Sequence, residues 1–201
     1  MFYEPKDGHG LPHDPIKAIV APRPIGWIST VDVGGRPNLA PYSYFNAIST
    51  DPPMVCFSSG GLKHSAANAR ATGEFVYNLA TRPLAREMNA SSEAVPPEVD
   101  EFELTGLATA ASRLVRPPRV AASPAAFECR VVTFMELTDV EGRGVGSFLV
   151  IGQVIGVHLD EAYLKAGRFD TAAAVPLGRC GYHDYTAVDD IFEMRRPGGG
   201  A

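Results

Sequence analysis

Short apolar runs bounded by turn residues recur along the chain and predict β-strands. A hairpin is predicted from "RPIGWISTVD" and "NLAPYSYF", because Gly34 and Gly35 between them allow the positive φ angles of a tight turn. Further strands are predicted where Val, Ile and Phe concentrate, at "PMVCFSS", "EFVYNLA", "AAFECRVVTFMEL" and "SFLVIGQVIGVHL". The last two runs are long enough to bend around a barrel, so we expect a mainly antiparallel β fold.

Two short, peripheral helices are predicted. The segment "SAANARAT" ends at Gly73, a residue suited to the position after a helix, and "RPLAREMNASS" follows Thr81 as a candidate N-cap. Residues 92–124 contain two Pro-Pro pairs and little periodicity, which indicates an ordered excursion across the barrel. We interpret the acidic run "EVDEFE" within it as a solvated loop. Residues 1–196 are expected to form one domain, and residues 197–201 a flexible tail.

Composition and charge narrow the classes of function. Hydrophobic residues at 45% and charged residues at 20% are values of a globular protein. A net charge of -5 with scattered Lys and Arg argues against a nucleic-acid partner. No apolar run reaches the length of a membrane span and no leader pattern is present, so we expect a cytoplasmic protein without a membrane partner. Cys56, Cys129 and Cys180 lack metal-ligand spacing, so reduced, mostly buried thiols and no metal site are expected.

Candidate ligand chemistry gathers between Ser58 and Ser65. Here a predicted strand passes through two serines and two glycines into a predicted helix that carries Lys63 and His64 at its start. Unpaired amides at a helix N-terminus, hydroxyl donors and a full positive charge together suit a phosphate. Taken alone, however, such a serine-glycine turn is more often only a helix cap.

A second segment rich in donors precedes the same predicted strand. In "NAISTDPP" the two prolines favour an extended turn, which would leave the Asn46 amide and the hydroxyls of Ser49 and Thr50 free to face a ligand. Two donor-rich loops would then flank "MVCFSS". A ligand with a phosphate at one end and a flat polar ring at the other would contact both loops.

Five segments that span nearly the whole chain occur in a distinctive order: "APRPIGWISTVDVGGRPNLAPYSYFNAISTDPPMVCFSSG", "KHSAANARATGEFVYNLAT", "VDEFELTGLAT", "AASPAAFECRVV" and "PLGRCGYHDYTAVDDIFEMRRP". In their order and spacing they resemble the flavin reductase-like family of FMN-binding split barrels, which includes flavoredoxin-like proteins. The resemblance implies an antiparallel Greek-key split β-barrel of six strands with a few short peripheral helices. It also implies a homodimer with FMN in a groove near the dimer interface.

The resemblance also implies which residues contact the cofactor. Arg23 and Trp27 are two further candidate contacts, although a lone Trp is commonly a core residue. The implied contacts are Asn46, Ala47 and Ser49 at the polar edge or ribityl chain of the flavin, Ser58, Lys63, His64 and Ser65 at the phosphate region, and Tyr44 and Phe45 through backbone contacts or apolar surface.

The hydride chemistry of such a protein belongs to the flavin, so no acid-base pair is required and no catalytic residue is assigned. The first interpretation is an oxidoreductase that takes hydride from NADH or NADPH and delivers it to flavin or to a partner such as a monooxygenase. The second is a flavoredoxin-like electron carrier without its own nicotinamide site, and the third is a divergent member with another ligand or none. Two alternatives are open for His158, which either contacts a nicotinamide or is a structural histidine. A catalytic pair could also be formed by Cys56 with His64 or by His183 with Asp184, but for both pairs we favour a packing role.

Overall fold

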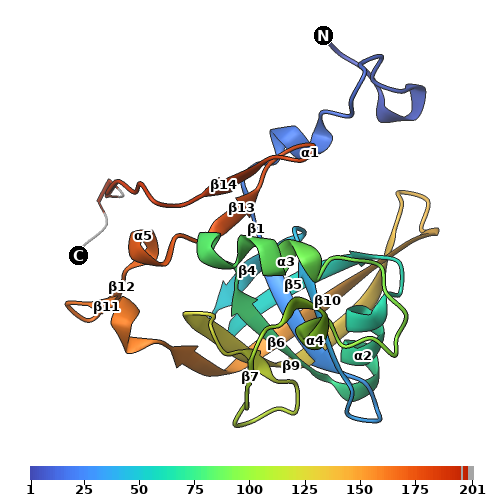
Figure 1. The fold of residues 1–201 in the computed structure, drawn as a ribbon. Coiled ribbons are helices and arrows are strands. Elements are labelled where there is room, and N and C mark those ends of the chain that lie inside the picture. The colour runs from blue at the N-terminus through green and yellow to red at the C-terminus, as the bar shows by residue number, and fades with distance from the viewer. Residues whose placement is uncertain (196, 199–201) are drawn as a thin grey trace.

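The computed structural model describes residues 1–195 and 197–198. At its centre lies one seven-stranded antiparallel sheet in the order β3-β2-β6-β9-β10-β5-β4 (Figure 1). The mainly antiparallel β prediction is confirmed, with one strand more than the six implied. Residues 199–201 of the predicted flexible tail lie outside the described residues. The strands of this sheet are β2 (Gly26–Val31), β3 (Pro37–Tyr42), β4 (Phe45–Thr50), β5 (Pro53–Gly60), β6 (Glu74–Leu79), β9 (Ala125–Thr138) and β10 (Gly144–Leu159).

Short elements surround the main sheet. Three small sheets pair β1 (Arg23–Pro24) with β13 (Leu177–Arg179) and β14 (Tyr185–Ala187), β7 (Thr109–Ala110) with β8 (Arg119–Val120), and β11 (Leu164–Lys165) with β12 (Arg168–Phe169). The α-helices are α1 (Ile16–Ile19), α2 (His64–Thr72), α3 (Ala85–Ala90), α4 (Glu101–Thr105) and α5 (Thr171–Ala174), and the 3-10 turns are η1 (Pro5–Asp7), η2 (Arg82–Leu84) and η3 (Glu161–Tyr163). Within residues 1–195 and 197–198, no helix is both long and apolar enough to cross a membrane.

The β2–β3 hairpin forms where it was predicted, but its turn needs only one left-handed residue. The amide of Asp32 donates to the carbonyl of Arg36 at 2.9 Å, and the amide of Gly35 donates back to Asp32 at 3.0 Å. Of the two turn glycines, Gly35 alone has a positive φ, of 89°. A side chain at Gly35 would therefore be strained, whereas the conformation of Gly34 is open to other residues.

Two sequence interpretations of helix starts and loops were wrong in part. The run "EVDEFE" is not a solvated loop, because Asp100 caps α4 by accepting the Phe102 amide at 2.8 Å, and Glu101 and Phe102 are buried. Phe102 joins an apolar cluster and Glu101 meets buried donors on β3, so the tertiary contacts outweigh the acidic composition. Thr81 does precede η2, but within the described chain its side chain makes no capping bond.

The segment "NAISTDPP" is strand β4 and its turn rather than a loop. β4 pairs with β5 through Asn46 opposite Cys56 and Ser49 opposite Met54, and the chain reverses at Asp51 and Pro52. The expected loop conformation is wrong because β4 pairs with β5, and the two prolines fall in the turn and at the first residue of β5. Proline is tolerated at these positions because it removes no ladder hydrogen bond there.

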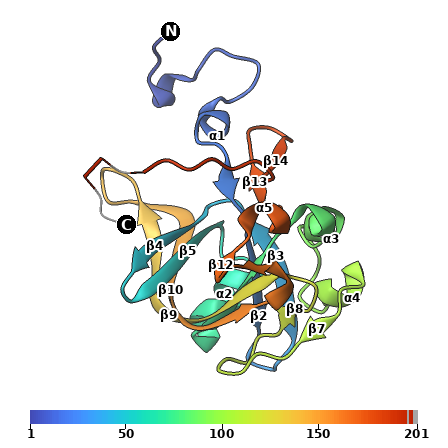
Figure 2. The same ribbon diagram turned by 90° about the vertical axis from the view of Figure 1, so that its left-hand side faces the viewer.

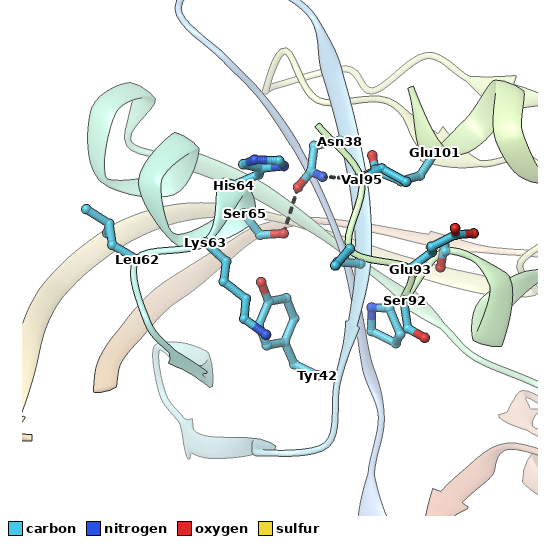
Figure 3. A pocket seen from close by; sticks show the side chains of 14 residues that line it. Asn38, Tyr42, Leu62, Lys63, His64, Ser65, Ser92, Glu93, Val95 and Glu101 are labelled. Atoms are coloured by element: carbon cyan, nitrogen blue, oxygen red, sulfur yellow. Dashed lines mark hydrogen bonds between the residues drawn. The ribbon is translucent and has the colours of Figure 1, made fainter. Parts of the chain in front are cut away.

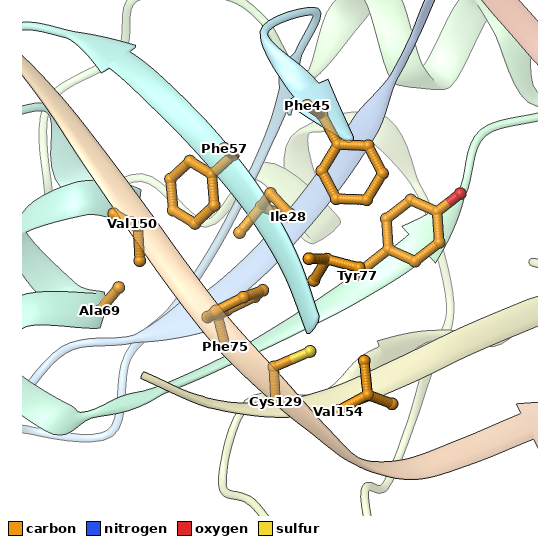
Figure 4. Close-up of a cluster of buried hydrophobic side chains, with 10 residues drawn as sticks. Ile28, Phe45, Phe57, Ala69, Phe75, Tyr77, Cys129, Val150 and Val154 are labelled. Carbon is orange, nitrogen blue, oxygen red and sulfur yellow. The ribbon is translucent and has the colours of Figure 1, made fainter. Parts of the chain in front are cut away.

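Large apolar side chains fill the space enclosed by the curved sheet (Figure 4). The rings of Phe45 and Tyr77 stack with centroids 4.6 Å apart, and Phe57 meets Phe75 edge to face at 5.4 Å. Trp27 is fully buried in a second apolar cluster, where its Nε1 donates to the Ser91 Oγ at 2.9 Å. Trp27 is therefore a core residue with a satisfied indole N–H.

The N-terminal segment and the β13–β14 hairpin lie together at one end of the barrel (Figures 1 and 2). β1 pairs with β13 there, with Arg23 opposite Arg179. The guanidinium of Arg23 also donates to the Cys180 carbonyl at 3.0 Å. These contacts join segments from the two ends of the chain and place both beside the end of β3.

Candidate functional site

A pocket of about 440 Å³ lies between β3, the start of α2 and the segment that follows α3 (Figure 3). β3 and α2 are fixed by the main sheet, because α2 follows β5 closely and packs on β2 and β3. The pocket is within the size range of small-molecule sites. The side chains on which its chemistry depends are Asn38, Tyr42, Lys63, His64, Ser65 and Glu101.

The start of α2 presents an uncapped helix N-terminus to this pocket. Lys63 is the N-cap residue with extended backbone, and no side chain among the described residues caps the helix. The first helical bond runs from the Ala67 amide to the Lys63 carbonyl at 2.8 Å, so the amides ahead of Ala67 have no partner within the helix. Lys63 is exposed and its side chain extends beside the Tyr42 ring (Figure 3). Amides, helix dipole and ammonium together suit an anionic group.

A chain of buried hydrogen bonds lies behind this helix start. The Ser65 Oγ donates to the Asn38 Oδ1 at 2.7 Å, and the Asn38 Nδ2 donates to the Glu101 Oε1 at 2.7 Å (Figure 3). The other Glu101 oxygen accepts the Leu39 amide at 3.0 Å. A satisfied buried network of this kind rigidifies the elements it joins. The Ser65 hydroxyl is thereby engaged within the protein, so Ser65 would meet a ligand through its backbone amide.

Burial shifts the pKa of two groups in the pocket. Burial raises the pKa of the Tyr42 hydroxyl, although hydrogen bonds with Ser65 and Ser59 act in the opposite sense, so at neutral pH it is a protonated donor. Burial likewise raises the pKa of the Glu101 carboxyl, against the lowering effect of the Leu39 amide, Asn38 and nearby His64. A carboxyl shifted toward its neutral form opposes a bound anion less than an ordinary carboxylate would.

The structure places the candidate contacts in separate locations. Phe45 points into the core, so only its backbone is open to a ligand. Tyr44 is exposed and lines a second pocket. The remaining candidates are Lys63, His64 and Ser65 on the first pocket, Asn46, Ala47 and Ser49 on edge strand β4, and Ser58 on β5.

Ser58 and Asn46 belong to the outer face of the sheet, next to apolar side chains. Phe57 is buried in the core, so its neighbours Cys56 and Ser58 point to the opposite face. Ser58 pairs with Leu149 on β10, and Leu149 pairs with the exposed Met135 on β9. Asn46 pairs with Cys56, and its Oδ1 accepts the next amide along the chain at 2.9 Å. The polar candidates thus adjoin a row of outward-facing apolar residues.

A second pocket of about 400 Å³ adjoins the first, because Pro41 and Ser92 line both. It lies between the N-terminal segment, the end of β3 and the β13–β14 hairpin, and Arg23 is one of its lining residues. In the part of the chain that the structure describes, no three His, Cys, Asp or Glu side chains come together in a way that would hold a metal ion.

Sequence reasoning missed three residues of the first pocket. Asn38 and Tyr42 lie on β3, in a segment interpreted only as half of a hairpin, and Glu101 lies in the run interpreted as a solvated loop. A usable signal was present for Asn38, a polar residue that directly precedes an apolar position in a predicted strand. For Glu101 the sequence carried no such signal, since its donors come from residues more than sixty positions away.

Comparisons with known proteins identify the family. Residues 20–174 match the flavin reductase like domain. An uncharacterized protein of Deinococcus radiodurans is 38% identical over 194 residues, which are 90% of this chain and 82% of that protein. The crystal structure of nitrilotriacetate monooxygenase component B from Bacillus cereus has a TM-score of 0.87 and 26% identity, and the match covers 96% of this chain and 98% of that one.

The fold is shared more widely than the sequence. A Shewanella frigidimarina protein described as having a split barrel domain has a TM-score of 0.81 at 21% identity, with 90% of each chain covered. At that identity the likeness supports the fold alone. It confirms the antiparallel split β-barrel with few short helices. The chain belongs to the flavin reductase-like family of split-barrel flavoproteins.

Proposed function

We propose that this protein binds FMN and reduces it with hydride from NADH or NADPH, passing the electrons to free flavin or to a partner enzyme. The observation that carries the proposal is the uncapped start of α2, with Lys63 beside it, opening into a pocket of about 440 Å³ in a chain of the flavin reductase-like family. The likeness to a monooxygenase component B supports a monooxygenase as the partner.

We assign the donors to the two ends of the cofactor. The amides at the start of α2 and Lys63 would hold the phosphate. Asn46 and Ser58 would meet the polar parts of the flavin from the outer face of β4 and β5. The bound flavin supplies the hydride chemistry, so the chain needs only to bind it, orient it and exclude water.

A homodimer belongs to the same proposal. Leu149 and Met135 form a neighbouring pair on the outer face, and Met135 is 46% exposed. A partner subunit on this face would cover apolar surface and enclose the flavin against water beside Asn46 and Ser58. The exposed row is therefore the surface that we assign to the dimer.

Anaerobic titration of the FMN-loaded protein with NADH and then NADPH tests the proposed reaction. The visible absorption of oxidised flavin should disappear within seconds at one equivalent of the preferred nucleotide. Bleaching by dithionite but by neither nucleotide would replace the reductase with the flavoredoxin-like electron carrier. Failure of the protein to bind any flavin would reject both interpretations.

The phosphate assignment has its own test in the affinities for FMN and riboflavin, which differ only by that group. Each charge-assisted hydrogen bond to phosphate contributes roughly 1.5 to 3 kcal/mol. FMN should therefore bind at least about tenfold more tightly in a fluorescence titration. Equal affinities would show that the start of α2 is only a helix end.

A further inference from the structure

The second pocket carries a concentration of positive charge. Lys17, Arg23 and Arg179 all line it, and none of its described lining residues is Asp or Glu. Glu87 and Asp184 are close in sequence to lining residues, but neither lines the pocket. The chain has a net charge of -5, so this cluster of cations distinguishes the pocket from the rest of the surface. The cluster raises the local concentration of anions, and the pocket therefore favours anionic ligands.

Arg23 is buried in this pocket without a counter-ion. It is 8% exposed, and its terminal nitrogens donate to the carbonyls of Lys17, Val20 and Cys180. Among the described residues, its Nε has no hydrogen-bond partner and no carboxylate lies within 4.0 Å of the guanidinium. The carbonyls orient the charge but do not cancel it, so a bound anion would offset the cost of burying it.

Aromatic rings accompany these cations. The Arg23 guanidinium carbon lies 5.9 Å from the centroid of the Tyr44 ring, and that of Arg179 lies 4.3 Å from the centroid of Tyr185. Arg179 is held in place because its Nη2 donates to the Tyr182 carbonyl at 2.6 Å. Flat tyrosine faces suit a planar ring, and positioned guanidinium groups suit an acidic substituent on it.

We propose that this pocket binds a small aromatic molecule that carries a carboxylate or phosphate group. A volume of about 400 Å³ accommodates one ring with its acidic group. Because Pro41 and Ser92 line both pockets, the molecule would lie beside the flavin site. Its use as a substrate rests on the proposed function, whereas its binding rests on the second pocket alone.

Isothermal titration calorimetry of the FMN-loaded protein with benzoate, phenyl phosphate and benzamide tests the proposal. Benzamide has nearly the shape of benzoate and carries no charge, so it is the matched neutral probe. We expect at least one anion to bind about tenfold more tightly than benzamide, with an advantage that shrinks as salt is raised. The stronger of the two anions identifies the acidic group as carboxylate or phosphate.

Two variants test whether the anion binds in the second pocket. Arg179→Gln should weaken binding of the preferred anion about tenfold and leave benzamide unchanged. Arg168→Gln, at the exposed position of β12, removes the same charge away from this pocket and should change neither affinity. Arg23 is kept, because its contacts with three backbone carbonyls join the ends of the chain.

Three results would overturn the proposal: equal binding of benzoate, phenyl phosphate and benzamide, an unchanged anion affinity in Arg179→Gln, or release of FMN by the anion. Release of FMN by the anion would show that this pocket is part of the flavin site. Repeating the titration on protein without FMN separates the two proposals. If FMN never binds and benzoate or phenyl phosphate still does, the proposed function fails while this site stands.

Discussion

The Glu128 carboxylate lies 2.5 Å from the Nε2 of His158, across the ladder between β9 and β10. Glu128 is fully buried and also accepts the amides of Arg113, Leu114 and Val115. Burial raises the pKa of the Glu128 carboxyl, but the bonds with His158 and with the Arg113 and Leu114 amides outweigh it, so the pKa is lowered. The pair therefore fastens the irregular segment before β8 to the sheet.

Glu128→Ala should lower the free energy of unfolding by about 3 kcal/mol, because it leaves buried amides without an acceptor. Urea denaturation at neutral pH measures the change. Glu103→Ala, which removes an exposed carboxylate from α4, should change stability by less than about 0.5 kcal/mol. Equal effects of the two substitutions would show that the buried carboxylate is not a structural anchor.

The sequence allows His158 to be a nicotinamide contact or a structural histidine, and its bond to Glu128 favours the structural alternative. His158→Gln should destabilise the protein by about 1 kcal/mol. The KM for NADH should stay within about twofold of the wild type at a temperature where both proteins are folded. A raised KM without a loss of stability would move His158 into the nicotinamide site.

The strands were predictable because their apolar runs are local, whereas buried acids were not. Glu101 and Glu128 are both buried, and each is satisfied by donors from another part of the chain, such as Asn38 and the Arg113 amide. Sequence composition favours exposure for a Glu, and only the tertiary donors reverse it. β4 was missed for a different reason: the two prolines that follow it indicated a turn, but they fall in the turn and at the first residue of β5, where proline is tolerated, so the strand extends up to them.

The two pockets also differ in whether the sequence could predict them. The start of α2 was predictable, because a turn, a lysine and a helix follow one another in the sequence. The second pocket was not, because it joins Arg23 to Cys180, 157 positions away. The roles assigned to Lys63 and Asn46 in holding FMN remain predictions.

A pH dependence of stability should follow from Glu101. Burial raises the pKa of its carboxyl above the unfolded value of about 4.3. Between the two pKa values the unfolded chain has released the proton and the folded chain retains it, so stability falls as pH rises. The Glu101→Gln side chain cannot titrate, so this variant does not lose stability in this way. The free energy of unfolding of Glu101→Gln minus that of the wild type should therefore increase as pH rises above about 4.

Urea denaturation of both proteins across this pH range measures the difference directly. Glu103→Gln, at an exposed position of the same helix, should show no such gain. Glu128 contributes the opposite slope, because its lowered pKa makes stability fall as pH drops, but this contribution is common to all three proteins and cancels. A constant difference between Glu101→Gln and the wild type would contradict the raised pKa.

Lys63→Ala should weaken FMN binding by about 1 kcal/mol at low salt, because an exposed ammonium is partly screened by water. The loss should shrink as salt is raised, and the rate of flavin reduction at saturating FMN should stay unchanged. Ser58→Ala should cost less and depend less on salt, since it removes a neutral donor. Flavin fluorescence titrations of the wild type and of each variant measure the affinities for FMN. Lys165→Ala, an exposed lysine on β11, is the control, and a loss as large as that of Lys63→Ala would reject the assignment.

The outer face of the sheet should hold the dimer together, and Met135→Lys tests this without disturbing the core. Met135 is 46% exposed and pairs with Leu149, so a charge there is solvated in a single subunit but would be buried in a dimer. Light scattering should give the dimer mass for the wild type and the monomer mass for Met135→Lys, together with weaker FMN binding. Val33→Lys, 80% exposed in the β2–β3 turn, should remain dimeric. A Met135→Lys variant that stays dimeric with normal FMN affinity would place the subunit interface elsewhere.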